Sequence, residues 1–364
     1  NAEDAGATEV AFDLTPNACH FEHNGTRHFD ERDIKSITGI FNSSKKDNPD
    51  KIGKFGVGFK SVFVYTDTPV IHSKNYSFKI LKLVLPQSVA PKPDLGEKTR
   101  FEFPFNNPKK SVEEAYTEVK TALEQLSDTT LLFLNDLRYI RWNVGDQQGA
   151  VLREEHSDGH IEVLKLVDGE EILSSHWLRF SAPVEDLHQF TAPVEGVERQ
   201  NVAVAFELTF LGNAKTFDTK KPLAKQLKIS PAIKGKVSVF FPAEKEVSGL
   251  RFHLHAPFIP ELSRASIKTT PENMPLYDQL AKVSAQALHS IKAMGLLSGE
   301  FLAVLPNNDD PLAERYNVIR KALLHEMKSQ ALVPTYAGGF AEASRLIQAR
   351  ASMKSLITDE DLAF

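Results

Sequence analysis

The strongest constraint on the fold comes from a glycine-rich segment at residues 52–63, Ile-Gly-Lys-Phe-Gly-Val-Gly-Phe-Lys-Ser-Val-Phe. Gly53, Gly56 and Gly58 follow a polar stretch and precede an apolar run that suits a buried helix. Glycine lets backbone N–H groups approach a ligand closely, and the positive end of a helix dipole attracts anions. The segment therefore predicts a polyphosphate cradle; the alternative is a tight turn that packs a helix against a sheet.

Two widespread nucleotide-binding arrangements do not match this segment. A Walker loop requires Gly-Lys followed by Ser or Thr at a fixed spacing, and that combination is absent here. A Rossmann turn directly follows a strand, whereas residues 42–50 are rich in Ser, Lys, Asp and Asn and are predicted to form a mobile loop. A phosphate site of another kind is therefore expected.

Four separated segments resemble, in chain order, the motifs of one ATPase superfamily. They are residues 1–7 (Asn-Ala-Glu-Asp-Ala-Gly-Ala), residues 23–25 (His-Asn-Gly), residues 53–58 and the Thr-x-Phe strand that begins at Thr99. The superfamily includes gyrase, the heat-shock chaperone ATPases, sensor histidine kinases and MutL, which share the Bergerat nucleotide-binding fold. The forms of the first two motifs most resemble the sacsin-type branch, in which bacterial multidomain proteins also occur.

The resemblance implies a ligand, Mg-ATP, and a role for individual residues. Asn1 is expected to hold Mg²⁺ and Asp4, one turn later, to line the pocket; Gly25 is expected to pass under adenine and Thr99 to hydrogen-bond the base. The expected nucleotide-binding residues are Asn1, Asp4, Ala5, His23, Gly25, Ser43, Ser44, Lys45, Gly53, Phe55, Gly56, Val57, Gly58, Phe59, Lys60 and Thr99. Among these, Ser43, Ser44 and Lys45 are expected in a lid over the phosphates, with a merely solvated loop as the alternative.

The resemblance also implies an α+β fold with two domains. Residues 1–130 are expected to form a Bergerat sandwich, in which helices cover a mixed, mainly antiparallel sheet. Residues 131–364 are expected to form a second, β-rich domain of βαβ type with helices at its end. The length of 364 residues is sufficient for two such domains.

Residue periodicity predicts individual elements along the chain. Strands are predicted at residues 10–14, 18–22, 68–72, 76–83, 99–103, 139–144, 161–167, 202–211 and 236–241. Helices are predicted at residues 30–37, 56–65, 111–126, 277–297, 312–330 and 340–353, with Ser111 as the cap of the third.

The sequence departs from the family pattern at the residue that contacts the adenine base and at the catalytic carboxylate. His23 stands where an Asp usually accepts a hydrogen bond from adenine N6; a neutral imidazole can accept one but carries no fixed negative charge, so base selectivity stays open. The general base, a Glu one turn before the box asparagine, is expected upstream of Asn1. Glu3 cannot replace it, because a residue two places further along projects to another face of a helix.

A candidate γ-phosphate sensor lies far along the chain. Residues 258–264, Phe-Ile-Pro-Glu-Leu-Ser-Arg, resemble the segment of the chaperone middle domain that carries an arginine toward the γ-phosphate. Arg264 is therefore the expected catalytic residue, and an ordinary surface arginine is the alternative. Such an arginine stabilises charge that develops on the transferred phosphoryl group.

Charge and cysteine content restrict the partners and the location. The 43 Lys and Arg residues against 48 Asp and Glu residues leave a net charge of −5, which excludes a general nucleic-acid coat. A local basic run at residues 220–236 leaves nucleic-acid contact open, although a solvated face is favoured.

Two histidine groups, at residues 20–28 and at residues 253–255, leave metal binding open. Cys19 is the single cysteine, so a reducing cytoplasm is expected. Contact with a membrane is not expected.

Two functions of different classes follow. The first is an ATP-binding and ATP-hydrolysing switch that closes its lid over Mg-ATP. It would transmit this change to the second domain, to a protein partner or to an attached effector domain. The switch is also expected to be able to form a nucleotide-dependent dimer. Chaperone-like action and bacterial defence are its expected settings. The second is a nucleotide-independent protein-interaction scaffold that retains the fold without catalysis.

Overall fold

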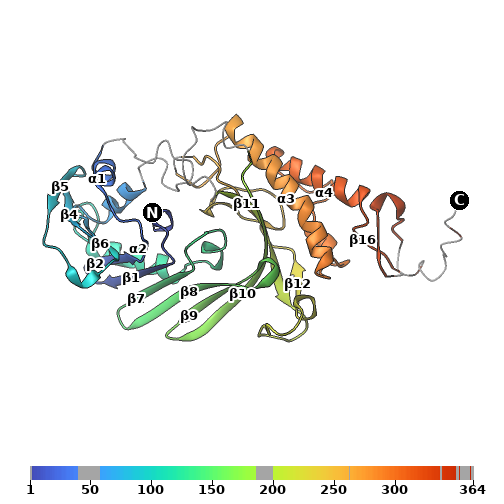
Figure 1. Cartoon of the computed structure of the whole chain (residues 1–364), viewed down its shortest axis with the longest axis horizontal. Coiled ribbons are helices and arrows are strands. Elements are labelled where there is room, and N and C mark those ends of the chain that lie inside the picture. The colour runs from blue at the N-terminus through green and yellow to red at the C-terminus, as the bar shows by residue number, and fades with distance from the viewer. Residues whose placement is uncertain are drawn as a thin grey trace.

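The computed structural model describes residues 2–39, 58–185, 200–261, 263–336 and 338–349, together with residues 352 and 361. Fourteen strands pair side by side in the order β14-β13-β15-β11-β10-β9-β8-β7-β1-β2-β6-β3-β4-β5, and β12 adds to β11 to complete one 15-stranded sheet (Figure 1). The sheet is mixed but mainly antiparallel, with β1–β7 and β13–β15 as parallel pairs. The predicted α+β class is confirmed.

The first half of the chain contributes six strands and two α-helices. Their bounds are β1 Glu9–Thr15, β2 Ala18–His23, α1 Glu31–Thr38, β3 Val70–Ser73, β4 Tyr76–Leu81, β5 Leu85–Ser88, β6 Thr99–Pro104 and α2 Val112–Glu124. The short 3₁₀-helices are η1 Glu3–Ala5, η2 Phe59–Val64, η3 Pro93–Leu95 and η4 Asp128–Thr130.

The second half contributes the remaining strands and two longer helices. Their bounds are β7 Tyr139–Val144, β8 Gln147–Glu155, β9 His160–Val167, β10 Glu170–Pro183, β11 Asn201–Phe210, β12 Leu227–Ser230, β13 Val237–Val239, β14 Phe241–Pro242, β15 His253–His255, α3 Met274–Ala293, α4 Asn317–Ser329, β16 Val333–Pro334 and β17 Phe340–Ala341. Its 3₁₀-helices are η5 Ser157–Gly159, η8 Leu223–Lys225, η9 Pro271–Asn273, η10 Phe301–Val304, η11 Glu314–Tyr316 and η12 Ala343–Arg345.

The strands of the first half have one apolar face and one polar face. Phe12, Phe21 and Phe101 lie on the same face, because Phe12 is paired with Phe21 and Phe21 with Phe101. The opposite face carries ion pairs such as Arg100 with Glu22. Such alternation is typical of a sheet covered by helices on one side, so the site is expected on the apolar face.

Helix capping agrees with the sequence. Ser111 caps α2: its hydroxyl accepts the N–H of Glu114, and the Glu114 carboxylate accepts the N–H of Ser111, which confirms the predicted cap. Asp30 and Asp33 form the same reciprocal arrangement at the start of α1. Both helices therefore begin where their side chains satisfy free N–H groups.

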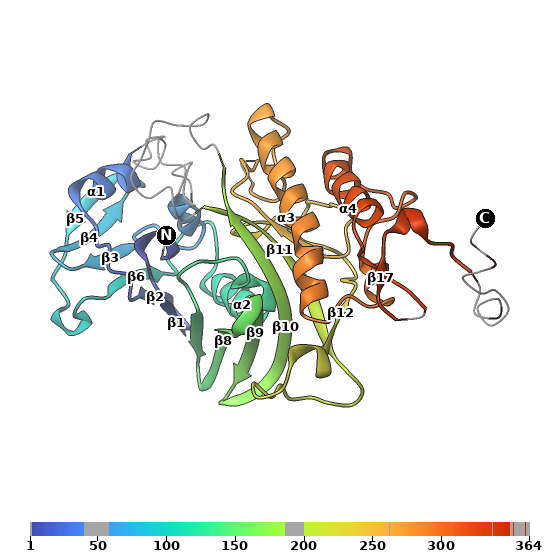
Figure 2. The same ribbon diagram turned by 45° about the vertical axis from the view of Figure 1, so that its right-hand side comes forward.

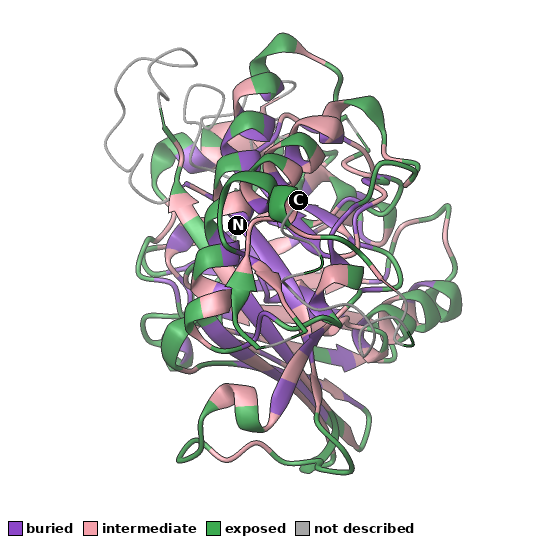
Figure 3. Ribbon diagram, turned by 90° about the vertical axis from the view of Figure 1, so that its right-hand side faces the viewer, coloured by how far each residue is buried: buried purple, intermediate pink, exposed green. Residues whose placement is uncertain are grey.

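In the second half, helices cover the far end of the sheet. α3 and α4 lie side by side, and α3 lies against β10 and β11 (Figure 2). Leu280, Leu288 and Ile291 of α3 are fully buried in the largest core, together with residues of β10, β11 and α4. Buried residues gather on the strands, while the outer helix turns and loops are exposed (Figure 3).

The sheet continues without interruption across residue 130. β1 pairs in parallel with β7, and one core combines Val10 and Leu14 of the first half with Ile140, Val163 and Ala205 of the second. The two halves therefore share one sheet and one core.

Several predicted elements differ from the structure. Residues 340–349 are not an α-helix: Phe340–Ala341 pairs with Val333–Pro334, and η12 is a single turn. Gly338 and Gly339, with φ of 83° and 105°, reverse the chain before this pair. Ile347 is 71% exposed, so the apolar spacing that predicted a helix has no core to pack on.

Two further predictions need adjustment. Residues 59–64 form a 3₁₀-helix, not an α-helix, and the beginning of the predicted 56–65 helix lies outside the described residues. The predicted strand at 236–241 is broken at Phe240, whose φ of 66° separates β13 from β14. In the part of the chain described here, no helix is both long and apolar enough to span a bilayer.

Candidate functional site

Three polar side chains form a row on the apolar face of the sheet. His23 of β2 is paired with Thr99 of β6, which is in turn paired with Ser73 of β3. The Thr99 and Ser73 hydroxyl oxygens are 2.8 Å apart, and Ser73 Oγ accepts the N–H of Phe29 at 3.1 Å. All three polar residues of the row are buried, so these contacts satisfy groups that have little access to water. The structure brings together the expected base-binding residues His23 and Thr99, and it adds Ser73, which sequence reasoning missed.

Gly25 lies where no side chain fits. A Cβ atom at this position would be 2.7 Å from the carbonyl oxygen of Ala5 and 2.9 Å from Nδ1 of His23. The N–H of Arg27 also donates to the Ala5 oxygen, at 3.2 Å, and thereby holds the 24–27 loop against η1. This packing requires glycine by itself, and the expected approach of Gly25 to adenine stays a prediction.

His23 has a defined tautomer. Its Nδ1 accepts the backbone N–H of Gly25 at 3.1 Å, and because an N–H can only donate, the ring proton is on Nε2. Burial lowers the pKa of His23 to about 4, so the ring is neutral at pH 7. The nitrogen that could accept from adenine N6 is thus already occupied, and the free nitrogen is a donor. The expected contact between His23 and the adenine base stays a prediction.

Glu3 has a structural role that its sequence position does not reveal. One oxygen of its buried carboxylate accepts the backbone N–H groups of Asn135 and Asp136, at 2.6 and 3.0 Å. The other oxygen accepts the N–H of Leu137 at 2.9 Å. Both oxygens therefore anchor η1 to the segment that leads into β7. This use fits the expectation that Glu3 is not the general base.

Arg264 lies close enough to Asp4 for their charges to interact. Burial lowers the pKa of the Arg264 guanidinium, and the Asp4 carboxylate acts in the opposite direction by favouring the charged form. The Arg264 loop is closed by a bridge between Pro260 and Ile267, and Arg264 itself has a φ of 57°. A residue of the first motif and the expected sensor arginine, 260 positions later, are thus brought together.

The residues that flank the glycine segment are tied to each other. Lys60 Nζ donates to the carbonyl oxygen of Gly39 at 2.5 Å. Phe59 is buried against Phe63 and Phe101, with ring centroids 6.2 and 6.1 Å away, which fastens η2 to the sheet. The expected ligands Asn1, Ser43, Ser44, Lys45, Gly53, Phe55, Gly56 and Val57 lie outside the described residues.

An apolar cavity of about 560 Å³ adjoins this region. It is lined by Ala2, Glu3, Val10, Phe12, Phe21, Gly58, Phe59, Val62, Tyr65, Phe101, Phe103, Val119, Ala122, Leu123, Leu126, Thr130, Leu137, Ile140 and Phe241. On β2, Phe21 lies two residues from His23, and on β6, Phe101 lies two residues from Thr99. An apolar lining cannot replace the water around a triphosphate, so the cavity suits an apolar body, and any phosphate groups need other partners.

Within the described ranges, neither histidine group contributes to a set of three metal-ligating side chains with closely spaced ligand atoms. His253 and His255 are buried against Trp177 and Phe133, and burial lowers the pKa of each to about 4. Among the described residues, three metal-ligating side chains with ligand atoms within 4.8 Å of one another occur instead at Glu154, His156 and Glu162.

The basic run is partly neutralised. Lys228 pairs with Glu300 at 2.7 Å and Lys221 with Asp218 at 3.1 Å. Lys236 Nζ is 3.2 Å from the Thr129 hydroxyl oxygen. The two ion pairs reduce the charge available for a phosphate backbone.

Comparison with known proteins supports the sequence resemblance. The sacsin domain model matches residues 21–87. Human Sacsin is 37% identical over 95 residues, which cover 21% of this chain and 2% of that protein. Protein NO VEIN of Arabidopsis thaliana is 27% identical over 291 residues, which cover 72% of this chain and 10% of that protein. The chain therefore spans a small fraction of the curated relatives it matches, and the sacsin-type resemblance is confirmed for a segment that includes His23, Gly25 and all the glycines of the cradle.

Three solved structures also overlap with the chain. The B-subunit of DNA gyrase from Myxococcus xanthus aligns with a TM-score of 0.42 and 9% identity, covering 80% of this chain and 88% of that one. The N-terminal domain of a DNA repair protein aligns with a TM-score of 0.29 and 10% identity, covering 71% and 81%. The MutL ATPase domain of Aquifex aeolicus aligns with a TM-score of 0.24 and 12% identity, covering 51% and 72%.

Proposed function

We propose, from the sacsin-type segment at residues 21–87, that this chain is an ATP-binding switch module. In this proposal Mg-ATP binds between the first motif, the His23–Thr99 row and the glycine segment, and the second half of the chain responds. The observation that carries the proposal is the interaction of Asp4 with Arg264, because it joins the first motif to a loop of the second half.

The described part of the site fits a nucleotide at its edges. Asp4 supplies a negative charge within the first motif and Arg264 a positive charge beside it, and Gly58 and Phe59, at the described end of the glycine segment, line the apolar cavity. Asn1 would hold Mg²⁺, and the N–H groups of residues 53–58 would hold the phosphates. Bound Mg-ATP would supply a phosphoryl group whose negative charge attracts cationic side chains.

Arg264 is proposed as the residue that reports the γ-phosphate. Its present electrostatic partner is the Asp4 carboxylate, and a γ-phosphate would compete for the guanidinium. Exchange of one partner for the other would move the 260–267 loop and, through it, the second half. Where hydrolysis takes place, such an arginine contributes on the order of 10³-fold in rate.

The organisation and setting of the switch are part of the proposal. Residues 1–130 are proposed as the nucleotide-binding domain and residues 131–364 as the responding domain, coupled through the β1–β7 pair. Ser43, Ser44 and Lys45 would belong to the lid, and hydrolysis would depend on a Glu before Asn1. The switch is proposed to act on a protein partner or an attached effector domain and to form a nucleotide-dependent dimer. Its proposed setting is the cytoplasm, in a chaperone-like or defence role.

Calorimetric titration with Mg-ATP tests the proposal. The intact chain is expected to show one saturable site, and Gly56→Asp is expected to abolish it by placing a side chain and a negative charge in the cradle. Gly299→Asp is the matched control, because a Cβ at Gly299 meets nothing within 4 Å. Absence of saturable binding by the intact chain, or equal binding by Gly56→Asp, would contradict the proposal.

A second candidate is a nucleotide-independent interaction scaffold. Two observations favour it: the cavity is lined almost entirely by apolar side chains, and His23 offers no acceptor for adenine N6. For this function, removal of the cradle by Gly56→Asp would leave partner capture unchanged. The same titration therefore separates the two candidates.

A further inference from the structure

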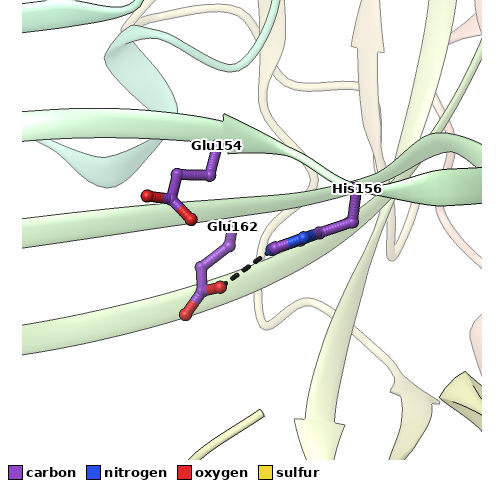
Figure 4. Close-up of side chains that lie close together, drawn as sticks. All are labelled: Glu154, His156 and Glu162. Carbon is purple, nitrogen blue, oxygen red and sulfur yellow. Dashed lines mark hydrogen bonds and ion pairs between the residues drawn. The ribbon is translucent and has the colours of Figure 1, made fainter. Parts of the chain in front are cut away.

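A row of ionisable side chains crosses the strands β8, β9 and β10, outside the proposed nucleotide site. Glu154 of β8 is paired directly with Glu162 of β9, and Glu162 with His176 of β10, so the three lie on one face of the sheet. His156 follows Glu154 by two positions. The side chains of Glu154 on β8, Glu162 on β9 and His156, just beyond the end of β8, extend toward one another (Figure 4).

The pairing of Glu154 with Glu162 places two carboxylates opposite each other. Like charges in directly opposite positions destabilise a sheet, unless a cation compensates for them. Among the described residues, no Lys or Arg forms an ion pair with either carboxylate, and the partners of Glu162 are His156 and His176. The row therefore lacks a permanent positive charge.

The geometry matches a first coordination shell. His156 Nε2 is 2.9 Å from one oxygen of Glu162, and one ligand atom from each of Glu154, His156 and Glu162 lies within 4.8 Å of the others. Two ligands that are each about 2.0–2.2 Å from a common Zn²⁺ ion are about 3.4 Å apart in tetrahedral geometry, so His156 and Glu162 need to separate slightly while Glu154 closes any remaining distance. Glu154 is exposed, and its side chain can make that movement.

Neighbouring buried groups orient the ligands. Ser174 Oγ donates to the other oxygen of Glu162 at 2.9 Å and lies 3.2 Å from His176 Nε2. His176 Nδ1 is in turn 3.0 Å from His160 Nε2. The ring of His156 stacks on that of His160, with centroids 4.7 Å apart. Such outer partners hold metal ligands in place and raise their affinity.

An opening next to the ligands allows an ion to enter. His156 and His160 line a cavity of about 450 Å³, which Asp158 and Phe217 also line. Among the three ligands, His156 borders this cavity and Glu154 is exposed to solvent, so an ion can reach them from outside and keep a coordination position for water.

We propose that Glu154, His156 and Glu162 bind a divalent transition-metal ion, represented by Zn²⁺. The ion compensates for the two opposed carboxylates and links the facing ends of β8 and β9. Imidazole and carboxylate together favour Zn²⁺ over Mg²⁺, which prefers oxygen ligands alone. The proposal does not depend on nucleotide binding.

Calorimetric titration of the chelator-treated full chain with ZnCl₂, in the absence of nucleotide, tests the site. The intact chain is expected to bind one Zn²⁺ ion saturably. Glu162→Gln and His156→Gln are each expected to lose this binding or to lower the affinity for Zn²⁺ at least tenfold. His289→Gln is the matched control: His289 pairs with Glu326 at 2.6 Å on the helix surface, where the described residues place no third ligand. It is expected to bind Zn²⁺ as the intact chain does.

A second variant and a second readout protect the test against misfolding. Glu154→Gln changes an exposed side chain and is expected to keep the circular dichroism spectrum while it weakens Zn²⁺ binding. Zn²⁺ is expected to raise the melting temperature of the intact chain and to do so less for Glu154→Gln, because a ligand that binds only the folded state stabilises it. The proposal is overturned if the intact chain shows no saturable uptake, or if Glu154→Gln binds Zn²⁺ unchanged.

Discussion

Nδ1 of His23 accepts a hydrogen bond from the backbone N–H of Gly25, two residues further along the chain, at 3.1 Å. The bond sets the tautomer of a residue that stands where the resembling ATPases carry an Asp. It leaves Nε2–H as a donor. A donor in that place complements a purine acceptor and not the N6 amino group of adenine.

The first prediction concerns base preference. His23→Asp restores an acceptor, and a charge-assisted hydrogen bond contributes about 1.5–3 kcal/mol, so the preference for ATP over GTP is expected to rise about tenfold or more. Competition of both nucleotides against a fluorescent analogue measures the ratio. His325→Asp, an exposed change on α4, is the charge control. An unchanged ratio in His23→Asp would show that His23 does not face the base.

Gly25→Ala is expected to destabilise the fold. The added methyl group would lie 2.7 Å from the Ala5 carbonyl oxygen, and overpacking of this kind costs about 1–3 kcal/mol. Urea unfolding measures the loss. Gly299→Ala, which meets open space, should stay within about 0.5 kcal/mol of the intact chain. Equal stabilities for the two variants would refute the packing role of Gly25.

Loss of the Glu3 carboxylate is expected to loosen the link between η1 and β7. Glu3→Ala leaves the N–H groups of residues 135–137 without their acceptor, and a buried unsatisfied donor costs about 1–3 kcal/mol. The free energy of unfolding should fall by about 3 kcal/mol, and less for Glu3→Gln, which keeps one acceptor. Hydrogen exchange should accelerate at residues 135–137. Glu170→Ala, which changes an exposed side chain, is the control. If it lowered the free energy of unfolding as much as Glu3→Ala does, the anchoring role of Glu3 would be contradicted.

Stability is expected to fall as the pH decreases from about 6.5 to 4. Burial lowers the pKa of His253 to about 4, whereas the unfolded chain titrates near 6.5, so the unfolded state binds more protons in this interval and gains stability relative to the fold. His253 alone can account for up to roughly 3 kcal/mol, because each pKa unit corresponds to about 1.4 kcal/mol. Urea unfolding at several pH values measures the slope. Because burial also lowers the pKa of His23 and His255 to about 4, His253→Gln should reduce the slope without abolishing it, and His325→Gln should leave it unchanged; the reverse order would exclude His253 as a source.

Arg264→Ala is expected to remove discrimination between ATP and ADP. If the guanidinium contacts the γ-phosphate, the ratio of the two affinities should fall about tenfold while ADP affinity stays constant, since charge-assisted bonds contribute about 1.5–3 kcal/mol. Calorimetry with a non-hydrolysable ATP analogue and with ADP gives both constants. Arg345→Ala, exposed beyond α4, is the control. A parallel loss of both affinities would assign Arg264 a structural role.

Local patterns in the sequence were sufficient for much of the secondary structure. Alternating apolar residues correctly indicated β1, β2, β6 and β7, and Ser111 marked the start of α2. These features depend on neighbours within a few positions, so they can be predicted from a single sequence. The motif spacing likewise identified the sacsin-type resemblance, which the match at residues 21–87 confirms.

Only the tertiary structure decided which distant groups meet. The tautomer of His23, the anchor formed by Glu3 and the opposition of Glu154 and Glu162 all depend on strand register or on contacts with backbone groups. Periodicity states which face a side chain occupies, but the residue opposite it is set when two strands pair. Residues 340–349 illustrate the same limit, because a helical spacing forms a stable helix only where a core is present to receive its apolar face.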